Sequence, residues 1–208
     1  MFLFDMDGTV TAAETLPLIA EHYGLLDEVG ELTRLAVMGQ MPYNESLEQR
    51  VALLGRLPVD EVSRLVAHVP LHRQVADFIA RHDDHCAIVT SNLDCWCEGL
   101  MRRLGCKAHC SIGRVAGNRV TGVASIMRKE DVVDAYRSAG RRVVFVGDGH
   151  NDLEAMRHAD VAIAVGLLPG TPAASLSAVV HHIFHDESAL CRHLENLSTA
   201  PAMTNSPL

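Results

Sequence analysis

Four short, largely apolar segments, each ending in polar residues, constrain the fold of this chain more than any other feature of its sequence. They lie at residues 2–4, 86–90, 142–146 and 161–165, and segments with helical spacing of apolar residues separate them. Strands that are apolar along their length fit a parallel sheet that helices cover on both faces. The sequence therefore predicts an α/β fold with a Rossmann-like parallel sheet.

A helical insertion is expected between the first and second strands. Apolar residues recur at helical spacing through residues 12–69, and prolines at positions 42 and 58 interrupt the run. We expect a core of residues 1–11 and 71–197 and a helical cap of residues 12–70. The glycine-bearing stretch around residues 113–122 is expected to form a hairpin or a loop. Residues 198–208 are polar and lack periodicity, which predicts a disordered tail.

Composition and charge exclude several classes of protein. The 208 residues are 48% hydrophobic and 21% charged, and the net charge is -8 without a run of Lys or Arg. This balance argues against nucleic acid or an anionic membrane surface as a partner. No apolar run approaches the ~20 residues of a membrane span, and Asp5 follows Met1 too soon for a signal peptide. We therefore expect a cytoplasmic protein, either a monomer or a homodimer.

Cysteine and histidine clusters raise the question of a zinc site. Four of the six cysteines lie close together, at Cys95, Cys97, Cys106 and Cys110. The spacing of the first two is too tight for a zinc knuckle, and on a helix they would point to different faces. We expect reduced, buried thiols instead. The histidines at 181, 182 and 185 are expected to form a solvated edge.

Polar side chains follow three of the predicted strands. They are Asp5 and Asp7, then Thr90 and Ser91, then Asp148, Asn151 and Asp152. Ligands bind at this edge of an open parallel sheet. Carboxylates that converge there repel one another unless a cation neutralises them, and oxygen ligands suit Mg²⁺. The pattern predicts a magnesium site and, with it, a substrate that carries phosphate.

The spacing at the end of the first strand divides the chemistry between Asp5 and Asp7, because side chains two positions apart point the same way. Asp5 is suited to attack phosphorus and form an aspartyl-phosphate. Asp7 can protonate the leaving oxygen and then deprotonate the attacking water. Asp148 would complete the metal site, while Lys129 would hold the nucleophile and Thr90 would bind phosphoryl oxygens.

Four motifs, in order, resemble those of the haloacid dehalogenase superfamily. They are Asp-Met-Asp-Gly-Thr-Val at 5–10, a hydroxyl residue after the strand at 86–89, Lys129 before a helix, and Gly-Asp-Gly-His-Asn-Asp at 147–152. The resemblance extends to about residue 197 and implies a Mg²⁺-dependent phosphohydrolase with a Rossmann-like core and a cap. It also implies that Asp5, Asp148 and the backbone carbonyl of Asp7 bind the metal. Asn151 would lie near the phosphate, with Asp152 in support.

The predicted insertion is similar to the C1 cap of the phosphoserine phosphatase branch. Glu14 and Arg50 stand where that branch carries the residues that recognise the ammonium and carboxylate groups of the amino acid, and Met38 and Tyr43 fall in a segment that lines its pocket. The chemistry agrees, because a guanidinium binds a carboxylate through two bonds and a Glu carboxylate accepts from an ammonium. O-phosphoserine is therefore the expected substrate.

One departure from that branch bears on the substrate. The branch continues the second motif with Gly-Gly-Phe, whereas this chain has Ser91, Asn92 and Leu93, which add side chains where the backbone approaches the phosphate. Thr90 is the expected phosphate-binding hydroxyl, with Ser91 in reserve. Another small phosphometabolite, or phosphoryl transfer to an alcohol such as homoserine, are alternatives. A dehalogenase and a non-catalytic phospholigand-binding module are further alternatives. The second carboxylate, at position 7, argues against both.

Overall fold

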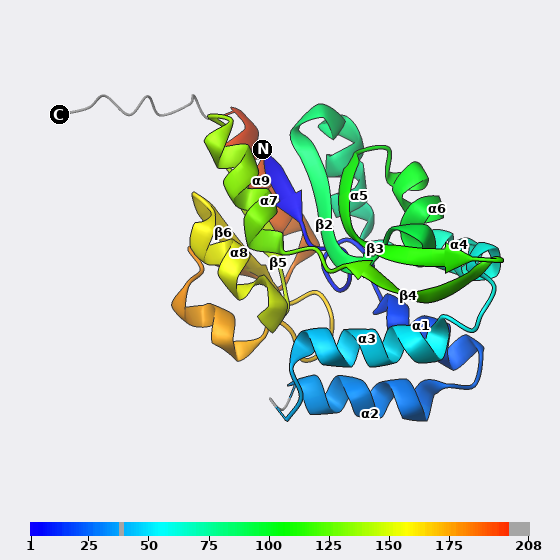
Figure 1. The fold of residues 1–208 in the computed structure, drawn as a ribbon. Helices are drawn as coiled ribbons and strands as arrows, with labels where there is room; N and C mark the ends of the chain where they lie inside the picture. Colours follow the sequence, from blue (N-terminus) through cyan, green and yellow to red (C-terminus); the bar gives the residue numbers. More distant parts are fainter. Residues whose placement is uncertain (38–39, 200–208) are drawn as a thin grey trace.

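A seven-stranded sheet in the order β4-β3-β2-β1-β5-β6-β7 organises the computed structural model, which describes residues 1–37 and 40–199 (Figure 1). The strands are β1 (Phe2–Phe4), β2 (Cys86–Leu93), β3 (Lys107–Ala116), β4 (Arg119–Ser125), β5 (Val144–Gly147), β6 (Val161–Val165) and β7 (His182–Phe184). Neighbouring strands pair in parallel except β3 and β4, which are antiparallel. The predicted α/β fold with a parallel sheet is confirmed.

Helices cover both faces of this sheet. They are α1 (Thr15–His22), α2 (Leu26–Val37), α3 (Tyr43–Leu54), α4 (Val59–Ala67), α5 (Arg73–Arg81), α6 (Asp94–Leu104), α7 (Lys129–Ser138), α8 (Leu153–His158) and α9 (Glu187–Thr199), with short 3-10 turns η1 (Asp83–His85), η2 (His150–Asp152) and η3 (Ala174–Ala178). Phe2 and Phe4 join the core cluster that includes residues of α5, α6 and α9, whereas Leu3 joins the cluster with residues of α7 and α8. The alternation along β1 thus explains why the strand is apolar throughout.

The helices α1 to α4 lie between β1 and α5 in the sequence, and α2 and α3 pack side by side at one end of the molecule (Figure 1). Helix α4 packs closely on α6, where a Cβ at Gly99 would lie 2.8 Å from the Cβ of Ala67 and 3.1 Å from the carbonyl oxygen of Ser63. Glycine at position 99 therefore allows the two helices to approach. The predicted division into a core and a cap of residues 12–70 stays a prediction.

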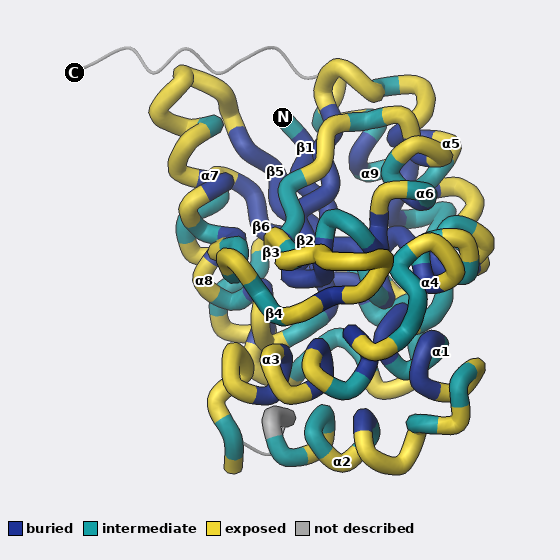
Figure 2. The backbone as a smooth tube through the Cα atoms, turned by 45° about the vertical axis from the view of Figure 1, so that its right-hand side comes forward, coloured by how far each residue is buried: buried dark blue, intermediate teal, exposed yellow. Residues whose placement is uncertain are grey.

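The stretch around residues 113–122 forms a hairpin, β3 and β4, that reaches over α3. Gly117 and Asn118 join the strands with φ values of 56° and 62°, as in two-residue hairpin turns. The amide of Val120 donates to the carbonyl of Gly55 at 3.1 Å, and the amide of Val59 donates to the carbonyl of Asn118 at 2.9 Å. The hairpin therefore ties α3 and α4 to the sheet. Its tip is exposed, whereas β1 and β5 are buried (Figure 2).

The structure corrects three expected boundaries. Strand β2 continues beyond Thr90 to Leu93, although its pairing with β3 shifts between these two residues. Strand β5 begins at Val144 rather than at residue 142. Helix α9 extends to Thr199, two residues into the segment expected to be disordered, because the hydroxyls of Ser198 and Thr199 donate to the carbonyl of Glu195 and prolong the helical end. Residues 200–208 lie outside the described part of the chain.

Candidate active site

The predicted site residues converge where β1, β2 and β5 end. These strands are neighbours and run in parallel, so their carboxyl ends meet at one edge of the sheet. Asp5 directly follows β1, and its amide donates to the carbonyl of Val146 in β5 at 2.8 Å. Thr90 lies near the end of β2, and Asp148 directly follows β5. Side chains from distant parts of the sequence thus reach one place.

Lys129 forms the ionic centre of this edge. It is the first residue of α7, and its Nζ lies 2.6 Å from Oδ1 of Asp5 and 2.6 Å from Oδ1 of Asp152. All three side chains are at most 7% exposed. Burial alone would lower the pKa of Lys129, but the negative charges of Asp152 and Asp5 raise it above its usual value. Lys129 therefore stays charged and fixes one oxygen of Asp5.

Both oxygens of Asp152 already have partners. Oδ1 pairs with Lys129, and Oδ2 accepts from the amides of Asp148 at 3.0 Å and Gly149 at 2.9 Å. Asp152 thus shapes the loop after β5 and orients the lysine. Sequence reasoning assigned it only a general supporting role, because the hydrogen bonds that define its function come from the folded loop. Asn151, its neighbour in η2, is exposed.

Asp5, Asp148 and Asp152 form an acidic group that could hold a cation. One oxygen of each lies within 4.8 Å of the others, and within residues 1–37 and 40–199 no other group of three His, Cys, Asp or Glu side chains does so. Burial and the charge of Asp152 raise the pKa of Asp148 to about 8. Burial and the same charge also raise the pKa of Asp5, against the opposing effect of Lys129. A divalent cation would remove this repulsion, so the oxygen ligands fit one.

A second carboxyl group, that of Asp7, is tied to the start of α1. Its Oδ1 accepts from the amide of Thr15 at 2.7 Å. Burial raises the pKa of Asp7, while hydrogen bonds from the hydroxyl and the amide of Thr15 lower it. Gly8 follows with a φ of 72°, and a side chain there would collide with the carboxylate of Asp148. Glycine therefore lets the first loop lie against the acidic group.

Three buried polar residues end β2, and each makes a different contact. The Oγ1 of Thr90 accepts from the amide of Asn92 at 3.1 Å, and the Nδ2 of Asn92 donates to the Oγ1 of Thr15 at 2.8 Å. Burial raises the pKa of the Tyr43 phenol, and the Ser91 side chain opposes that shift. None of the three is more than 7% exposed. The sequence indicated Thr90 and Ser91 as candidates, but nothing in it indicated that Asn92 and Thr15 are bonded to each other.

Two of the candidate substrate-binding residues, Glu14 and Arg50, lie directly before α1 and on α3. Arg50 is 6% exposed, and its guanidinium carbon lies 5.7 Å from the centre of the Tyr43 ring. Glu14 precedes α1 and is exposed as a residue. Desolvation of its carboxyl group and the charge of Asp7 raise the pKa of Glu14 to about 7, whereas Arg50 lowers it. These residues thus share the electrostatic environment of Asp7. Met38, expected to line the same pocket, lies outside the described residues.

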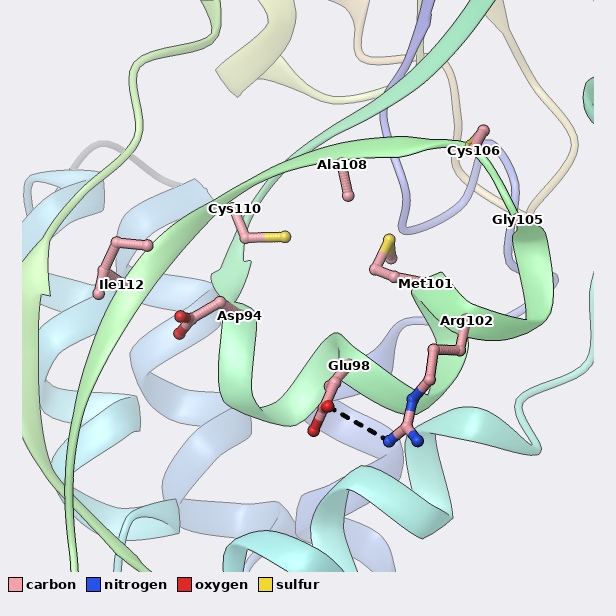
Figure 3. Close-up of a pocket in the computed structure, with 9 residues that line it drawn as sticks. All are labelled: Asp94, Glu98, Met101, Arg102, Gly105, Cys106, Ala108, Cys110 and Ile112. Atoms are coloured by element: carbon pink, nitrogen blue, oxygen red, sulfur yellow. Dashed lines mark ion pairs between the residues drawn. The ribbon is translucent and has the colours of Figure 1, made fainter. Parts of the chain in front are cut away.

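A separate surface pocket of about 530 Å³ lies between α6 and β3 (Figure 3). Cys106 and Cys110 line it, and Glu98 forms an ion pair of 3.4 Å with Arg102 beside them. Burial raises the pKa of Cys106 to about 11 and that of Cys110 to about 12, so both thiols stay protonated at neutral pH. None of the predicted site residues lines this pocket.

The described residues contain no helix with both the length and the apolar character needed to cross a membrane.

A family model described as haloacid dehalogenase-like hydrolase matches residues 2–157. The phosphoserine phosphatase of Halobacterium salinarum is 30% identical over 184 residues, which cover 82% of this chain and 87% of the relative. That of Archaeoglobus fulgidus is 29% identical over 177 residues, which cover 79% of this chain and 52% of the relative.

The chain spans only about half the length of several relatives, with 52%, 44% and 47% of three phosphoserine phosphatases covered. Among solved structures, a phospho-aspartyl intermediate analogue of phosphoserine phosphatase has a TM-score of 0.77 at 24% identity, covering 92% of this chain and 97% of that one. A substrate-bound phosphoserine phosphatase has a TM-score of 0.78 at 22% identity, covering 94% and 96%. These likenesses show the fold. The family match covers most of the sequence, so the chain belongs to the haloacid dehalogenase-like hydrolase family.

Proposed function

We propose that this protein is a Mg²⁺-dependent phosphomonoesterase that works through an aspartyl-phosphate on Asp5, and that its substrate is O-phosphoserine. The observation that carries the proposal is the Lys129 ammonium 2.6 Å from Asp5, beside the carboxylate of Asp148, where three parallel strands end. The lysine orients one Asp5 oxygen toward an incoming phosphoryl group and offsets the charge of that group, which leaves the other oxygen for the metal. The relatives named phosphoserine phosphatase support the same reaction.

The metal would be held by the carboxylates of Asp5 and Asp148 and by the backbone carbonyl of Asp7. Bound Mg²⁺ supplies positive charge that neutralises these carboxylates and polarises the phosphoryl oxygens. The occupied oxygens of Asp152 leave that residue to orient Lys129 and the loop after β5. The raised pKa values of Asp5 and Asp148 support this assignment, because converging buried carboxylates of this kind favour a cation between them.

In the first step, an oxygen of Asp5 forms a bond to phosphorus as the bond between phosphorus and the ester oxygen breaks. Asp7, protonated at the start, gives its proton to that leaving oxygen and becomes a carboxylate. In the second step, Asp7 takes a proton from a water molecule whose oxygen attacks phosphorus. The bond to Asp5 then breaks, which releases inorganic phosphate and restores both side chains.

Thr90 is better placed than Ser91 to bind a phosphoryl oxygen. The Thr90 hydroxyl accepts from the Asn92 amide, which leaves its hydrogen available to donate. The Ser91 side chain instead acts on the phenol of Tyr43, whose pKa it lowers against the effect of burial. We therefore assign the phosphate contact of the second motif to Thr90.

Arg50 and Glu14 support an amino-acid ester as the substrate. The guanidinium of Arg50 is buried, and Arg50 and Glu14 both act electrostatically on Asp7 or are acted on by it, so the partners that a carboxylate and an ammonium need lie on this side of the site. Asn151 is proposed to approach the phosphate from η2.

Phosphate release from a panel of phosphorylated amino acids, sugars and nucleotides, with Mg²⁺ and with EDTA, tests the proposed function. A strong Mg²⁺-dependent preference for phosphoserine supports it, and release from none of the panel refutes it.

Arg50→Ala should lower kcat/KM for phosphoserine by about 10- to 100-fold, because a hydrogen-bonded charge pair contributes about 1.5–3 kcal/mol. O-phosphoethanolamine has the ammonium group but no carboxylate, so its kcat/KM should change by less than about 3-fold. The exposed Arg56 of the same insertion offers a matched Arg56→Ala control, which should leave both values unchanged. Equal losses for the two substrates would show that Arg50 does not recognise the carboxylate.

Mg²⁺ should raise the melting temperature of the protein. At a free concentration 100-fold above the Kd, binding to the folded state adds about 2.7 kcal/mol, and a chain of this size should melt about 5–10 °C higher. Differential scanning calorimetry with Mg²⁺ and with EDTA measures this shift. Asp148→Asn should remove most of it, whereas the exposed Asp27→Asn should keep it. An equal shift in Asp148→Asn would contradict the assigned metal site.

A further inference from the structure

Asn92 connects two parts of the site through the two ends of its side-chain amide. Its Oδ1 accepts from the amide of Leu93 at 2.7 Å, which fixes the orientation of the side-chain amide. Its Nδ2 must then point away, and it donates to the Oγ1 of Thr15 at 2.8 Å. Asn92 is 4% exposed and Thr15 is fully buried, so water does not compete for these bonds. The end of β2 is thereby joined to the first residue of α1.

Thr15 passes this constraint to Asp7. Its amide donates to Oδ1 of Asp7 at 2.7 Å. Because its Oγ1 accepts from Asn92, the hydroxyl hydrogen is left for an acceptor. The Thr15 side chain also lowers the pKa of Asp7 against the effect of burial. Strand β1 ends at Phe4, well before α1 begins at Thr15, so strand pairing does not fix the position of Thr15. The Asn92 side chain supplies the missing anchor.

We propose that Asn92 is a positioning residue, which holds Thr15 and through it aims the carboxyl group of Asp7 at the leaving oxygen of the substrate. The inference rests on the proposed function, in which Asp7 is the proton donor. Glycine at position 92, as in the phosphoserine phosphatase branch that the chain resembles, has no side-chain donor. The Asn92 side chain is therefore an addition relative to that branch.

The test compares esters with different leaving groups. An alkyl phosphate such as phosphoserine needs a proton at its leaving oxygen, whereas p-nitrophenyl phosphate releases a stable phenolate without one. The ratio kcat/KM reports the steps up to phosphorylation of Asp5. Asn92→Ala should lower kcat/KM for phosphoserine about 10- to 30-fold, and for p-nitrophenyl phosphate less than about 3-fold. A merely structural defect would lower kcat/KM equally for the two esters, and that result would overturn the proposal. No change in kcat/KM for either ester would overturn it as well.

A double-mutant cycle asks whether Asn92 acts through Thr15. Thr15→Val removes the hydroxyl but keeps the shape and the amide, and it should reproduce the selective loss with phosphoserine. Adding Asn92→Ala to Thr15→Val should cause little further loss, and additive losses would contradict the proposal. Asn92→Ser, which is too short to reach Thr15, replaces Asn92→Ala if that variant does not fold. The exposed Asn196 of α9 gives a matched control, Asn196→Ala, that should behave as the wild type.

Hydrogen exchange separates this inference from the proposed function. If Asn92 holds Thr15, the amide of Thr15 should exchange at least about 10-fold faster in Asn92→Ala than in the wild type, as measured by NMR. The amide of Asp5, bonded to Val146, serves as the internal reference and should be unchanged. Unchanged exchange at Thr15 overturns the anchor itself. If exchange at Thr15 is faster in Asn92→Ala but the wild type hydrolyses no phosphate ester, the hydrogen bond from Asn92 does hold Thr15. That result would nevertheless refute the role of Asp7 and the proposed function together.

Discussion

Asp5→Asn is expected to lower kcat for phosphate monoesters by about 10⁴-fold or more, because an amide oxygen cannot form the aspartyl-phosphate of the proposed reaction. The loss should be the same for alkyl and aryl esters, since no leaving group replaces the nucleophile. Steady-state phosphate release, with an excess of variant enzyme where rates are low, measures it. Turnover within 10-fold of the wild type, a margin of about 1.4 kcal/mol, would refute the assignment of the nucleophile.

The same substitution should leave the fold intact. The introduced side-chain amide keeps an oxygen for Lys129, and the change removes one negative charge from a buried group in which Asp152 still balances the lysine. We therefore expect no fall in the melting temperature without Mg²⁺, and loss of the Mg²⁺-dependent rise. The exposed Asp27→Asn is the matched control and should retain both activity and the Mg²⁺ effect.

Lys129→Met is expected to affect stability and activity together. The change leaves Asp5 and Asp152 without their cation in a site that is almost fully buried. Breaking a buried ion pair from one side costs about 3–5 kcal/mol, so we expect the free energy of unfolding to fall by that amount in urea titrations without Mg²⁺. Turnover should fall by at least about 100-fold, because the nucleophile loses its orientation and its charge partner.

The matched control for this prediction is Lys107→Met, since Lys107 lies on β3 and is exposed. Its free energy of unfolding should stay within about 0.5 kcal/mol of the wild type. Adding Asp152→Asn to Lys129→Met should recover part of the lost stability by removing one of the unpaired charges. If Lys129→Met alone unfolds at the wild-type urea concentration, the ionic centre does not stabilise the fold as described.

The central strands could be predicted because their sequences are apolar and are buried on both faces. The end of β2 could not, because Ser91 and Asn92 are polar, and their burial depends on partners from α1 and α3. Strand β7 has only three residues, His182–Phe184, none of them fully buried, so it lacks the apolar pattern of the others. Thr199 joins α9 through side-chain bonds to the preceding turn, which composition does not reveal.

Some residues of the candidate site could likewise be predicted from the sequence, and others could not. Asp5, Lys129 and Asp148 were predictable from their order in the chain, because the carboxyl ends of parallel strands meet at one edge. The partners of Asp152 and the bond from Asn92 to Thr15 were not, because they depend on the direction of side chains brought together by folding. Sequence reasoning thus indicates the groups that we propose to react, whereas the structure identifies the hydrogen bonds around them.

Chemical trapping can show directly whether Asp5 becomes phosphorylated. The protein is mixed with phosphoserine carrying a radiolabelled phosphate and Mg²⁺, quenched in acid within one turnover, and reduced with borohydride before peptide mapping. We expect label on the N-terminal peptide before reduction and conversion of residue 5 to homoserine after it. Label on another residue, or rapid turnover with no label on the protein at any quench time, would contradict it.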